Sequence, residues 1–465
     1  MKSFHIAIDL GASGGRVALG WLENNKLEVQ ILHRFWNGST PIRAALYWDM
    51  IGLWREIRFG LSLAAARAKE LGGVVSSLGV DSWAVDYALL DEFDNFIDGV
   101  RCYRDPRTQG VMEAVNISRE NIFAISGLQF LPFNTLYQVL ATPKAYLERA
   151  KTLLLVPDLL HFWLTGKKVC ERTNASTTQF YDATTGNWAF GLLEQLGLPH
   201  HFLPKIVEAG TNLGLLEPSL AKELGLEQAV LIAVGTHDTA SAVAATPLTD
   251  SSSAYISSGT WSLVGLETQA AVLSPAALEF NLTNEAGVYG TNRLLKNVMG
   301  LWILQECRRA WDNPDWEVLY QEAQNAKSIG QINPDDPRYL HPGLDMPARV
   351  VADLGEGTFS RGEMVRCVLE SLAAKYALVI KQLEQVTKIE VKTIFVVGGG
   401  SQVMLLNQLT ANTSGKTVIA GMTDATLNGN LVLQLEALEQ IPLGYGRQLT
   451  RLSHSFRHFY PQGAA

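Results

Sequence analysis

The stretch Asp9-Leu-Gly-Ala-Ser-Gly-Gly-Arg16, DLGASGGR, decides the fold. A short, mostly apolar run over residues 4–10 leads into its glycines, and strand patterns resume over 16–22 and 27–35. Consecutive strands joined by short polar or glycine-containing turns predict an antiparallel meander. Because a strand follows the glycines, they are not the helix-opening loop of a dinucleotide-binding fold.

A helical pattern follows this meander. It runs from Asp49, the predicted N-cap, to about Leu71. Residues 77–80 then read as a buried strand that ends at Asp81. A carboxylate therefore stands at the end of this strand, as Asp9 stands at the end of the first one.

The opening strand, turn and strand occur a second time. Residues 254–257 and 261–267 have strand patterns, and Ser258-Gly-Thr260 forms the tight turn that joins them. The polar stretch 247–253 before this copy is typical of a domain boundary. The sequence thus predicts two α/β domains, 1–246 and 247–465. Ligands of such pairs usually bind in the cleft between the domains.

Composition and charge exclude several classes of protein. The 465 residues are 47% hydrophobic and 18% charged, as in a large globular enzyme. The 46 acidic and 38 basic residues give a formal charge of −8, which would repel nucleic acid. Asp9 interrupts the N-terminus before a signal-peptide core, and no apolar run is long enough to span a membrane. The four cysteines are far apart, which argues against zinc knuckles and disulfide frameworks. We therefore expect a cytoplasmic protein.

The first glycine turn has the residue types of a phosphate-binding loop. Glycines let backbone amides approach phosphate oxygens closely. Asp9, just before the turn, is placed to hold Mg²⁺ near the same phosphates, directly or through water. A plain β-hairpin turn is the alternative, because glycines serve it equally well.

Three further positions combine a strand end with groups suited to ligands. In 235–242, Asp238 follows an apolar strand and could accept a proton from an attacking hydroxyl, or could simply cap the next helix. Thr260 could reach a terminal phosphate, or belong to an ordinary hairpin. Gly398-Gly-Gly400 follows a strand at 393–397 and could support a nucleotide, or only allow tight helix packing.

Taken in order, ten stretches resemble the FGGY carbohydrate kinases, a family of the actin-like ATPase superfamily. They are DLGASGGR (9–16), DSWAVDY (81–87), YRDPRT (103–108), GLQFLPFNTLYQ (127–138), PDLLHFWLTG (157–166), TNASTTQ (173–179), GTHDTASAV (235–243), YISSGTWSL (255–263), LKNVMGLWILQE (295–306) and VVGGGSQVMLLNQL (396–409). The resemblance extends from about residue 4 to about residue 440 and implies two actin-like (ribonuclease H-like) α/β domains with a cleft between them.

The resemblance also implies an activity and a set of residues. The chain would be an ATP- and Mg²⁺-dependent kinase of a small-molecule ketose, with Asp238 as the catalytic base. The ATP-binding residues would be Ala12, Ser13, Gly14, Gly15, Arg16, Thr260, Gln305 and Gly399. The sugar-binding residues would be Ala84, His237, Asp238, Thr239 and Asn297. Asn297 and Gln305 would lie about 80° apart around one predicted helix.

Two departures from the family pattern bear on the sugar. Ala84 replaces an expected glycine, and 133–136 replaces a lysine-containing segment. The stretches 127–138 and 295–306 are most similar to the branch that phosphorylates O1 of L-rhamnulose. The alternatives are a sister kinase for L-fuculose, xylulose or another polyol, and a non-catalytic actin-like sugar sensor. We expect a monomer or a homodimer.

Overall fold

The computed structural model describes residues 2–355 and 357–463. Its first three strands are β1 (Lys2–Gly11), β2 (Gly14–Glu23) and β3 (Lys26–Trp36), and they pair antiparallel in sequence order. This confirms the predicted meander. Gly11 pairs with Gly14, so Ala12 and Ser13 alone form the turn.

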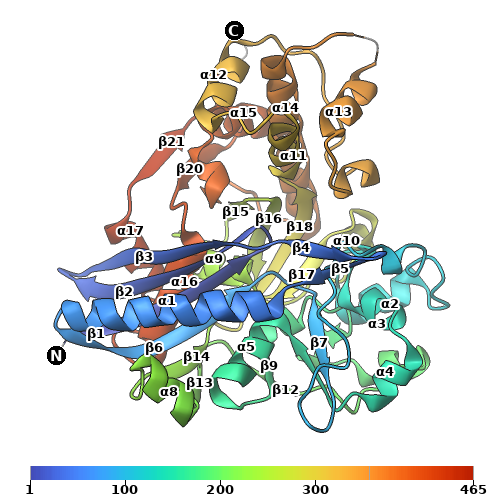
Figure 1. Cartoon of the computed structure of the whole chain (residues 1–465). Coiled ribbons are helices and arrows are strands. Elements are labelled where there is room, and N and C mark those ends of the chain that lie inside the picture. Colours follow the sequence, from blue (N-terminus) through green and yellow to red (C-terminus); the bar gives the residue numbers. More distant parts are fainter. Residues whose placement is uncertain (1, 356, 464–465) are drawn as a thin grey trace. The chain divides into compact units, whose positions relative to one another are not determined.

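Two parallel strands extend this sheet on the other side of β1. They are β6 (Gly73–Ser82), beside β1, and β14 (Val230–Ala233), beside β6. With the antiparallel β13 (Thr211–Leu215), the strand order is β13-β14-β6-β1-β2-β3 (Figure 1). The carboxyl ends of β1, β6 and β14 therefore meet at one edge of the sheet.

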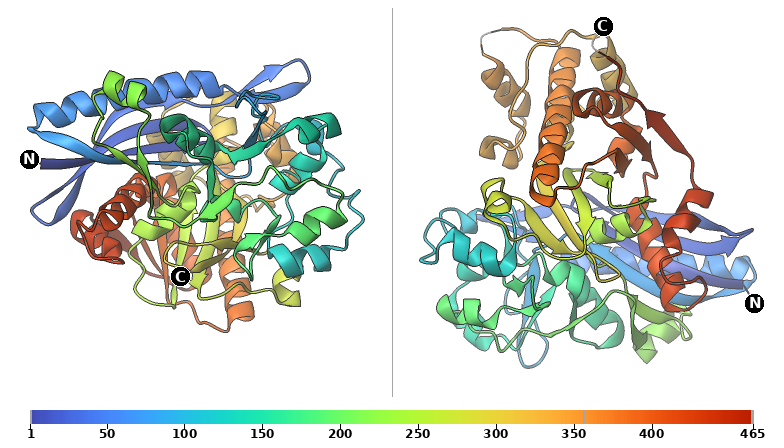
Figure 2. Two further views of the ribbon diagram at one scale, coloured as in Figure 1. Left: turned by 90° about the horizontal axis from the view of Figure 1, so that it is seen from below. Right: turned by 180° about the vertical axis from the view of Figure 1, so that it is seen from behind.

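Helices cover both faces of this sheet. Helix α1 (Met50–Glu70), whose N-cap is Asp49 as predicted, lies along the meander in Figures 1 and 2. Its Gly60 packs directly on Val17 of β2. Helix α16 (Ala425–Ala437) packs on the opposite face, where Leu431 joins Ala7 and Ala18 in a buried cluster. Val17 and Ala18 are consecutive residues of a strand and so point to opposite faces.

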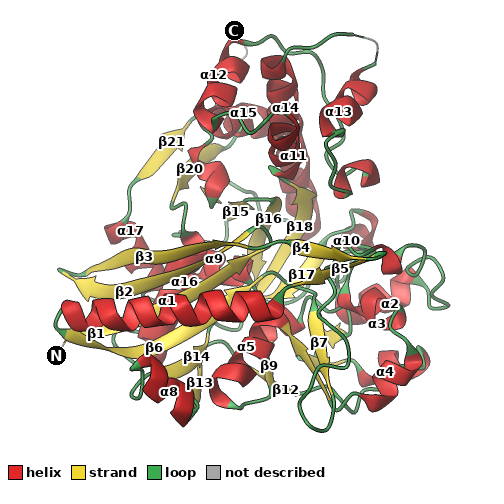
Figure 3. Ribbon diagram, in the orientation of Figure 1, coloured by secondary structure: helices red, strands yellow, loops and turns green. Residues whose placement is uncertain are grey.

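A second sheet contains the second strand–turn–strand unit. Its strands β15 (Ser253–Ser258) and β16 (Trp261–Thr268) pair antiparallel around a turn at Gly259 and Thr260, as predicted. β19 (Thr393–Val397) and β20 (Thr417–Gly421) add in parallel beside β15. Six of its strands follow the order β18 (Asn292–Met299), β16, β15, β19, β20 and β21 (Phe456–Phe459). Figure 3 shows α14 (Arg361–Thr387) and α15 (Met404–Ser414) as neighbouring helices of the same part.

The chain forms two compact units that interleave in the sequence. Unit 1 comprises residues 1–247, 268–293 and 425–453, and unit 2 comprises 248–267, 294–424 and 454–465. Each has a sheet with associated helices, in agreement with the predicted two-domain α/β fold. The predicted domains 1–246 and 247–465 are each continuous, whereas unit 1 also contains the segments 268–293 and 425–453 of the predicted second domain.

The other elements complete the two units. Those of unit 1 are β4 (Ser39–Ile42), β5 (Ala45–Trp48), β7 (Tyr87–Leu90), α2 (Arg119–Ser126), α3 (Thr135–Leu140), α4 (Lys144–Arg149), β8 (Thr152–Leu155), α5 (Val156–Thr165), β9 (Val169–Glu171), α6 (Arg172–Ala175), β10 (Tyr181–Asp182), β11 (Asn187–Trp188), α7 (Phe190–Gln195), β12 (Lys205–Val207), α8 (Pro218–Leu224), α9 (Asp238–Ala245), α10 (Pro275–Glu279), β17 (Thr283–Ala286) and α17 (Gly446–Ser453). Those of unit 2 are α11 (Trp302–Ala310), α12 (Trp316–Asn325), α13 (Met346–Leu354) and β21 (Phe456–Phe459), and β18 (Asn292–Met299) begins in unit 1 and continues into unit 2.

The expected helix that would hold both Asn297 and Gln305 is wrong. Asn297 lies in strand β18, and Gln305 lies in helix α11. Gly300 separates the two elements: a Cβ atom there would lie 2.6 Å from Ser262 Oγ. The chain turns against β16 at this point. The apolar residues before Gly300 have a spacing that also fits a helix, but their pairing with β16 makes them a strand.

Two expectations drawn from composition can be compared with the structure. Cys102, Cys170, Cys307 and Cys367, whose spacing argued against zinc knuckles and disulfide frameworks, are buried free thiols. In the part of the chain that the structure describes, no helix has the length and apolar character needed to cross a membrane.

Candidate active site

Two aspartates and an arginine meet at the carboxyl edge of the first sheet. Asp9 of β1 stands opposite Arg16 of β2 and beside Asp81 of β6 in the strand register. Both carboxylates are buried, and Arg16 forms an ion pair with Asp9. Asn430 of α16 donates from Nδ2 to Asp81 Oδ2 at 2.6 Å. No donor from residues 2–355 or 357–463 reaches the buried Oδ1 of Asp81.

The local electrostatics disfavour further negative charge. Burial raises the pKa of Asp81 well above its usual value, and the nearby Asp9 carboxylate raises it further. Burial also raises the pKa of Asp238, an effect that His237 opposes and Asp9 reinforces. The charges of Asp9 and Asp238 thus raise the pKa of Asp81, and the charge of Asp9 raises that of Asp238, so this group of carboxylates favours binding of a cation.

Asp238 is the first residue of helix α9, and its side chain remains 30% exposed. Its Oδ1 accepts a hydrogen bond from Thr239 Oγ1 at 3.1 Å and lies 3.6 Å from His237 Nε2. The N-cap position belongs to His237, whose side chain makes no capping hydrogen bond. Asp238 is thus not the N-cap that its alternative role requires.

A buried glutamate that was not among the predicted site residues holds the turn before Asp238. Glu171 is fully buried, and its Oε2 accepts hydrogen bonds from Thr236 N at 2.9 Å and Thr173 Oγ1 at 2.5 Å. His237 N donates in turn to Thr173 Oγ1 at 3.2 Å. Desolvation raises the pKa of Glu171, which these hydrogen bonds oppose. The turn is therefore fixed by contacts with β9 and α6.

The segment around Ala84 is held in a strained conformation. Val85 has a φ of +69°, which is rare for a β-branched residue and typically costs about 1–3 kcal/mol. Its carbonyl oxygen accepts a hydrogen bond from Thr135 Oγ1 at 2.7 Å. Asp86 is buried, and its Oδ2 accepts from Trp48 Nε1 at 2.6 Å and Trp83 Nε1 at 3.0 Å. These contacts stabilise the backbone on which Ala84 lies.

The titration of Asp86 leads to a first prediction. Burial raises the pKa of Asp86 to about 6, although several hydrogen bonds oppose this. An aspartate in the unfolded chain titrates near about 3.9, so between these two values the folded chain binds more protons. The contribution of Asp86 to stability is therefore fully present below about pH 4. As the pH rises through about 6 it is lost, by about 3 kcal/mol.

The measurement is the melting temperature of the wild type and of Asp86→Asn from pH 4 to pH 7. The difference, wild type minus variant, should decrease across this range, because other carboxylates titrate equally in both proteins. A difference that does not vary with pH would mean that Asp86 titrates as it does in the unfolded chain.

The predicted residues of unit 2 form a second group. Thr260 Oγ1 donates to Gln305 Oε1 at 3.3 Å, so these two predicted ATP contacts are neighbours although they lie on different elements. Gly398 has a φ of +79°, and a Cβ atom there would lie 2.8 Å from the carbonyl oxygen of Ser258. A Cβ atom on Gly399 would meet no atom of the described chain within 4 Å. The backbone at Gly399 is therefore open to a ligand.

The predicted residues thus divide between the units. Unit 1 contains Asp9, Ala12–Arg16, Ala84 and His237–Thr239, whereas unit 2 contains Thr260, Asn297, Gln305 and Gly399. Sequence reasoning missed Glu171, Asn430, Glu285 and Arg293, because the contacts that link them to the site are made with residues distant in the chain. The run of small polar residues at 173–179 was the one sequence signal near Glu171.

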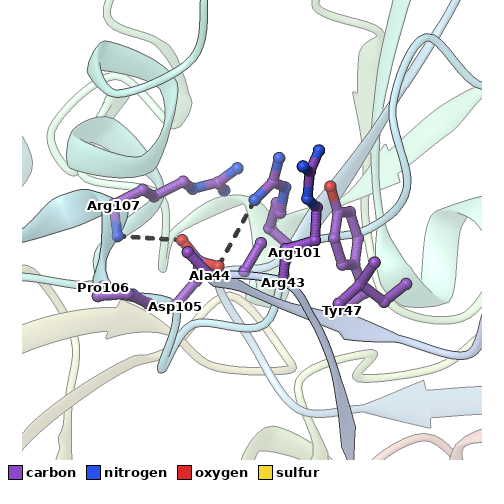
Figure 4. Close-up of a pocket in the computed structure, with 9 residues that line it drawn as sticks. Arg43, Ala44, Tyr47, Arg101, Asp105, Pro106 and Arg107 are labelled. Atoms are coloured by element: carbon purple, nitrogen blue, oxygen red, sulfur yellow. Dashed lines mark hydrogen bonds and ion pairs between the residues drawn. The ribbon is translucent and has the colours of Figure 1, made fainter.

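A separate open pocket of unit 1, of about 490 Å³, contains none of the predicted site residues. Arg43, Arg101 and Arg107 line it, together with Tyr47 and Asp105 (Figure 4). Arg101 pairs with Asp98 at 3.1 Å and with Asp105 at 3.6 Å, and its guanidinium lies 4.3 Å from the ring centre of Tyr47. These carboxylates compensate much of the positive charge, so we assign no ligand to this pocket.

Comparisons with known proteins give a consistent result. The N-terminal domain model of the FGGY family of carbohydrate kinases matches residues 4–245, and the C-terminal domain model matches 254–438. A rhamnulokinase of Oceanobacillus iheyensis is 42% identical over 98% of this chain and 97% of its own length. A rhamnulokinase of Bacillus subtilis is 37% identical over 98% and 95% of the two chains.

Solved structures share the fold at much lower sequence identity. Xylulose kinase from Lactobacillus acidophilus has a TM-score of 0.79 at 17% identity, covering 99% of this chain and 94% of that one. Glycerol kinase from Plasmodium falciparum, solved with ADP, has a TM-score of 0.80 at 14% identity with the same coverage. The chain therefore belongs to the FGGY family of carbohydrate kinases and is an ATP-dependent sugar kinase.

Proposed function

We propose that this kinase transfers the γ-phosphate of ATP to O1 of L-rhamnulose. The observation that carries the proposal is its similarity, over nearly the whole chain, to relatives that are named rhamnulokinase. The sequences of 127–138 and 295–306 support the same sugar. Phosphoryl transfer needs mainly alignment of the reactants and neutralisation of charge, which a few positioned groups supply.

Asp238 is the proposed general base. It accepts the proton of the sugar hydroxyl as that oxygen attacks the γ-phosphorus. A base is most effective when its pKa lies near the working pH, and partial burial raises the pKa of Asp238 in that direction. Its exposed fraction of 30% leaves the carboxylate accessible to a substrate.

The first glycine turn is the proposed binding loop for the ATP phosphates, with Ala12, Ser13, Gly14, Gly15 and Arg16. A Cβ atom on Gly15 would lie 2.2 Å from the ring of Phe35, so a side chain at this position would displace that ring. A glycine at position 15 therefore preserves the packing of Phe35 beside the turn, and glycines in general let backbone amides approach phosphate oxygens closely. Arg16 adds positive charge beside them.

Asp9 and Asp81 have the donor set expected for Mg²⁺. Two buried carboxylates lie side by side, and one oxygen of Asp81 has no donor among the described residues. Residues 2–355 and 357–463 contain no group of three or more His, Cys, Asp or Glu side chains arranged to hold a metal ion. Mg²⁺ in kinases, however, is usually bound by one or two carboxylates together with substrate phosphates and water. We propose Asp9 as its main ligand, where the ion would neutralise charge on the phosphates.

The remaining predicted residues are proposed as contacts on the sugar and on the nucleotide. Ala84, His237, Thr239 and Asn297 are proposed to contact the sugar. Thr260, Gln305 and Gly399 are proposed to contact the nucleotide, supported by the Thr260–Gln305 hydrogen bond and the open backbone at Gly399.

The setting of the enzyme is also a proposal. We propose that it acts in the cytoplasm as a monomer or homodimer. Its formal charge of −8 argues against nucleic acid as a partner.

A substrate panel tests the proposed sugar. Among common ketoses and polyols, L-rhamnulose should give the highest kcat/KM, with the 1-phosphate as product. ADP release measured across the panel, followed by NMR of the product, checks both points. A tenfold preference for another sugar, worth about 1.4 kcal/mol in transition-state binding, would overturn this assignment and favour a sister kinase.

A further inference from the structure

A buried ion pair lies behind His237. Glu285 of β17 and Arg293 of β18 both belong to unit 1, and Arg293 is completely buried. Arg293 Nη2 lies 3.1 Å from Glu285 Oε2 and 3.1 Å from His237 Nδ1. His237 Nδ1 itself lies 3.1 Å from Glu285 Oε2. The imidazole ring thus has its Nδ1 side against the ion pair and its Nε2 3.6 Å from Asp238 Oδ1.

The hydrogen bond between Arg293 and His237 indicates which nitrogen of the ring carries the proton. A guanidinium has only donors, so its hydrogen bond to His237 requires Nδ1 to be the acceptor. A neutral imidazole whose Nδ1 accepts has its proton on Nε2. Glu285 keeps the guanidinium in place, and Arg293 Nε donates to the carbonyl oxygen of Ala286 at 3.2 Å.

The same segment anchors both partners. Ala286 N, at the end of β17, donates to Ser176 Oγ at 2.8 Å. His237 N donates to Thr173 Oγ1 at 3.2 Å. The strand that carries Glu285 and the turn that carries His237 are therefore fixed to one another through residues 173–176. A buried ion pair is expensive to desolvate, so its place beside a site residue favours a role in positioning.

We propose that Glu285 and Arg293 are positioning residues that hold His237 as a neutral imidazole with its proton on Nε2, toward Asp238. This inference rests on the proposed roles of His237 and Asp238. With Nε2 protonated, His237 can donate a hydrogen bond to a sugar oxygen but cannot accept the proton of the attacking hydroxyl. Asp238 is then left to accept that proton, and the two neighbouring side chains have separate tasks.

The direct test is NMR of the wild-type chain with ¹⁵N-labelled histidine, with the signals of His237 identified by their loss in His237→Gln. We expect a protonated Nε2 and an unprotonated Nδ1. The opposite tautomer, in which Nδ1–H donates to Glu285, would overturn the proposal. This measurement does not depend on which sugar the enzyme prefers, so it can fail or succeed independently of the proposed function.

Kinetics provide the second test. The double variant Glu285→Gln/Arg293→Met removes both charges together, because removing one would leave the other buried and unpaired. We expect kcat/KM for the preferred ketose to fall by about tenfold to a hundredfold, as for loss of an oriented hydrogen bond, with KM for ATP unchanged. The ¹⁵N signals of His237 should also change.

The matched control is Arg58→Met/Glu223→Gln, which removes an exposed ion pair of the same unit and should leave both readouts unchanged. If the double variant does not fold by circular dichroism, Arg293→Lys keeps the positive charge and is measured instead. It should lower kcat/KM for the ketose, because an ammonium cannot reproduce the paired contacts of the guanidinium. Wild-type kinetics with either variant in its folded state would overturn the proposal.

Discussion

Replacing Asp238 with asparagine is expected to lower kcat by about 10²- to 10⁴-fold, the usual contribution of a general base. The amide has nearly the same size and can still contact a hydroxyl group, but it cannot accept a proton. Sugar binding measured by calorimetry should therefore change far less than kcat. The loss should appear in single-turnover rates, where the chemical step is observed directly.

Folding has to be separated from chemistry in this variant. Asp238 is in the first turn of α9 without being its N-cap, so the substitution should cost at most about 1 kcal/mol of stability. Glu120→Gln is the matched control, because it removes an exposed first-turn acid from α2 and should leave kcat unchanged. If Asp238→Asn keeps more than about a tenth of the wild-type kcat, Asp238 is not the base. Asp81, its neighbour at the sheet edge, would then be the next residue to replace.

Local patterns were enough to predict the first meander and the second strand–turn–strand unit. In both, short apolar strands are separated by turns whose glycines and polar residues define the ends, so each element is identified by neighbours in sequence. Asp49 as the N-cap of α1 was predictable for the same reason. Each of these features depends on contacts within a few residues.

Residues 292–310 show where such reasoning fails. Their apolar side chains fit both a strand and a helix, and only the pairing of β18 in the second sheet decides for a strand before Gly300. The interleaving of the two units has the same origin: α16 packs on a sheet whose first strand is more than 400 residues away in sequence. Long-range packing of this kind leaves no local pattern.

The candidate site was predictable to the extent that a family resemblance identifies residues. Asp9, His237 and Asp238 lie in motifs, whereas Glu285, Arg293 and Asn430 were not noticed. A single arginine or glutamate in an apolar strand reads as a surface residue of an edge strand. Its role becomes apparent only when the site residue that it contacts, tens or hundreds of residues away in the chain, is seen beside it. Positioning residues are for this reason harder to predict than the residues they position.

Replacing Asp9 with asparagine should have the other large effect. If Asp9 is the main protein ligand of Mg²⁺, the amide weakens that site, and several kcal/mol of charge stabilisation at the phosphates is lost. A loss of about 3 kcal/mol corresponds to a rate about a hundredfold lower at ordinary Mg²⁺ concentrations. The Mg²⁺ concentration that gives half-maximal rate should rise by at least about tenfold.

A titration of Mg²⁺ at saturating ATP and sugar measures both quantities in the same experiment. Asp9→Asn also removes the ion pair with Arg16, so melting temperature and circular dichroism must be compared with the wild type. The control is Glu23→Gln, which removes the carboxylate of an exposed ion pair with Lys2 at the far end of β2 and should leave the Mg²⁺ dependence unchanged. Both variants lose one negative charge, so a general effect of charge on the Mg²⁺ dependence would appear in both. Loss of a metal ligand would change the Mg²⁺ dependence only in Asp9→Asn. An unchanged half-maximal Mg²⁺ concentration in Asp9→Asn, with kcat within tenfold of wild type, would assign the metal to another carboxylate. Asp81, with an oxygen that no donor of the described chain reaches, would then be the strongest candidate.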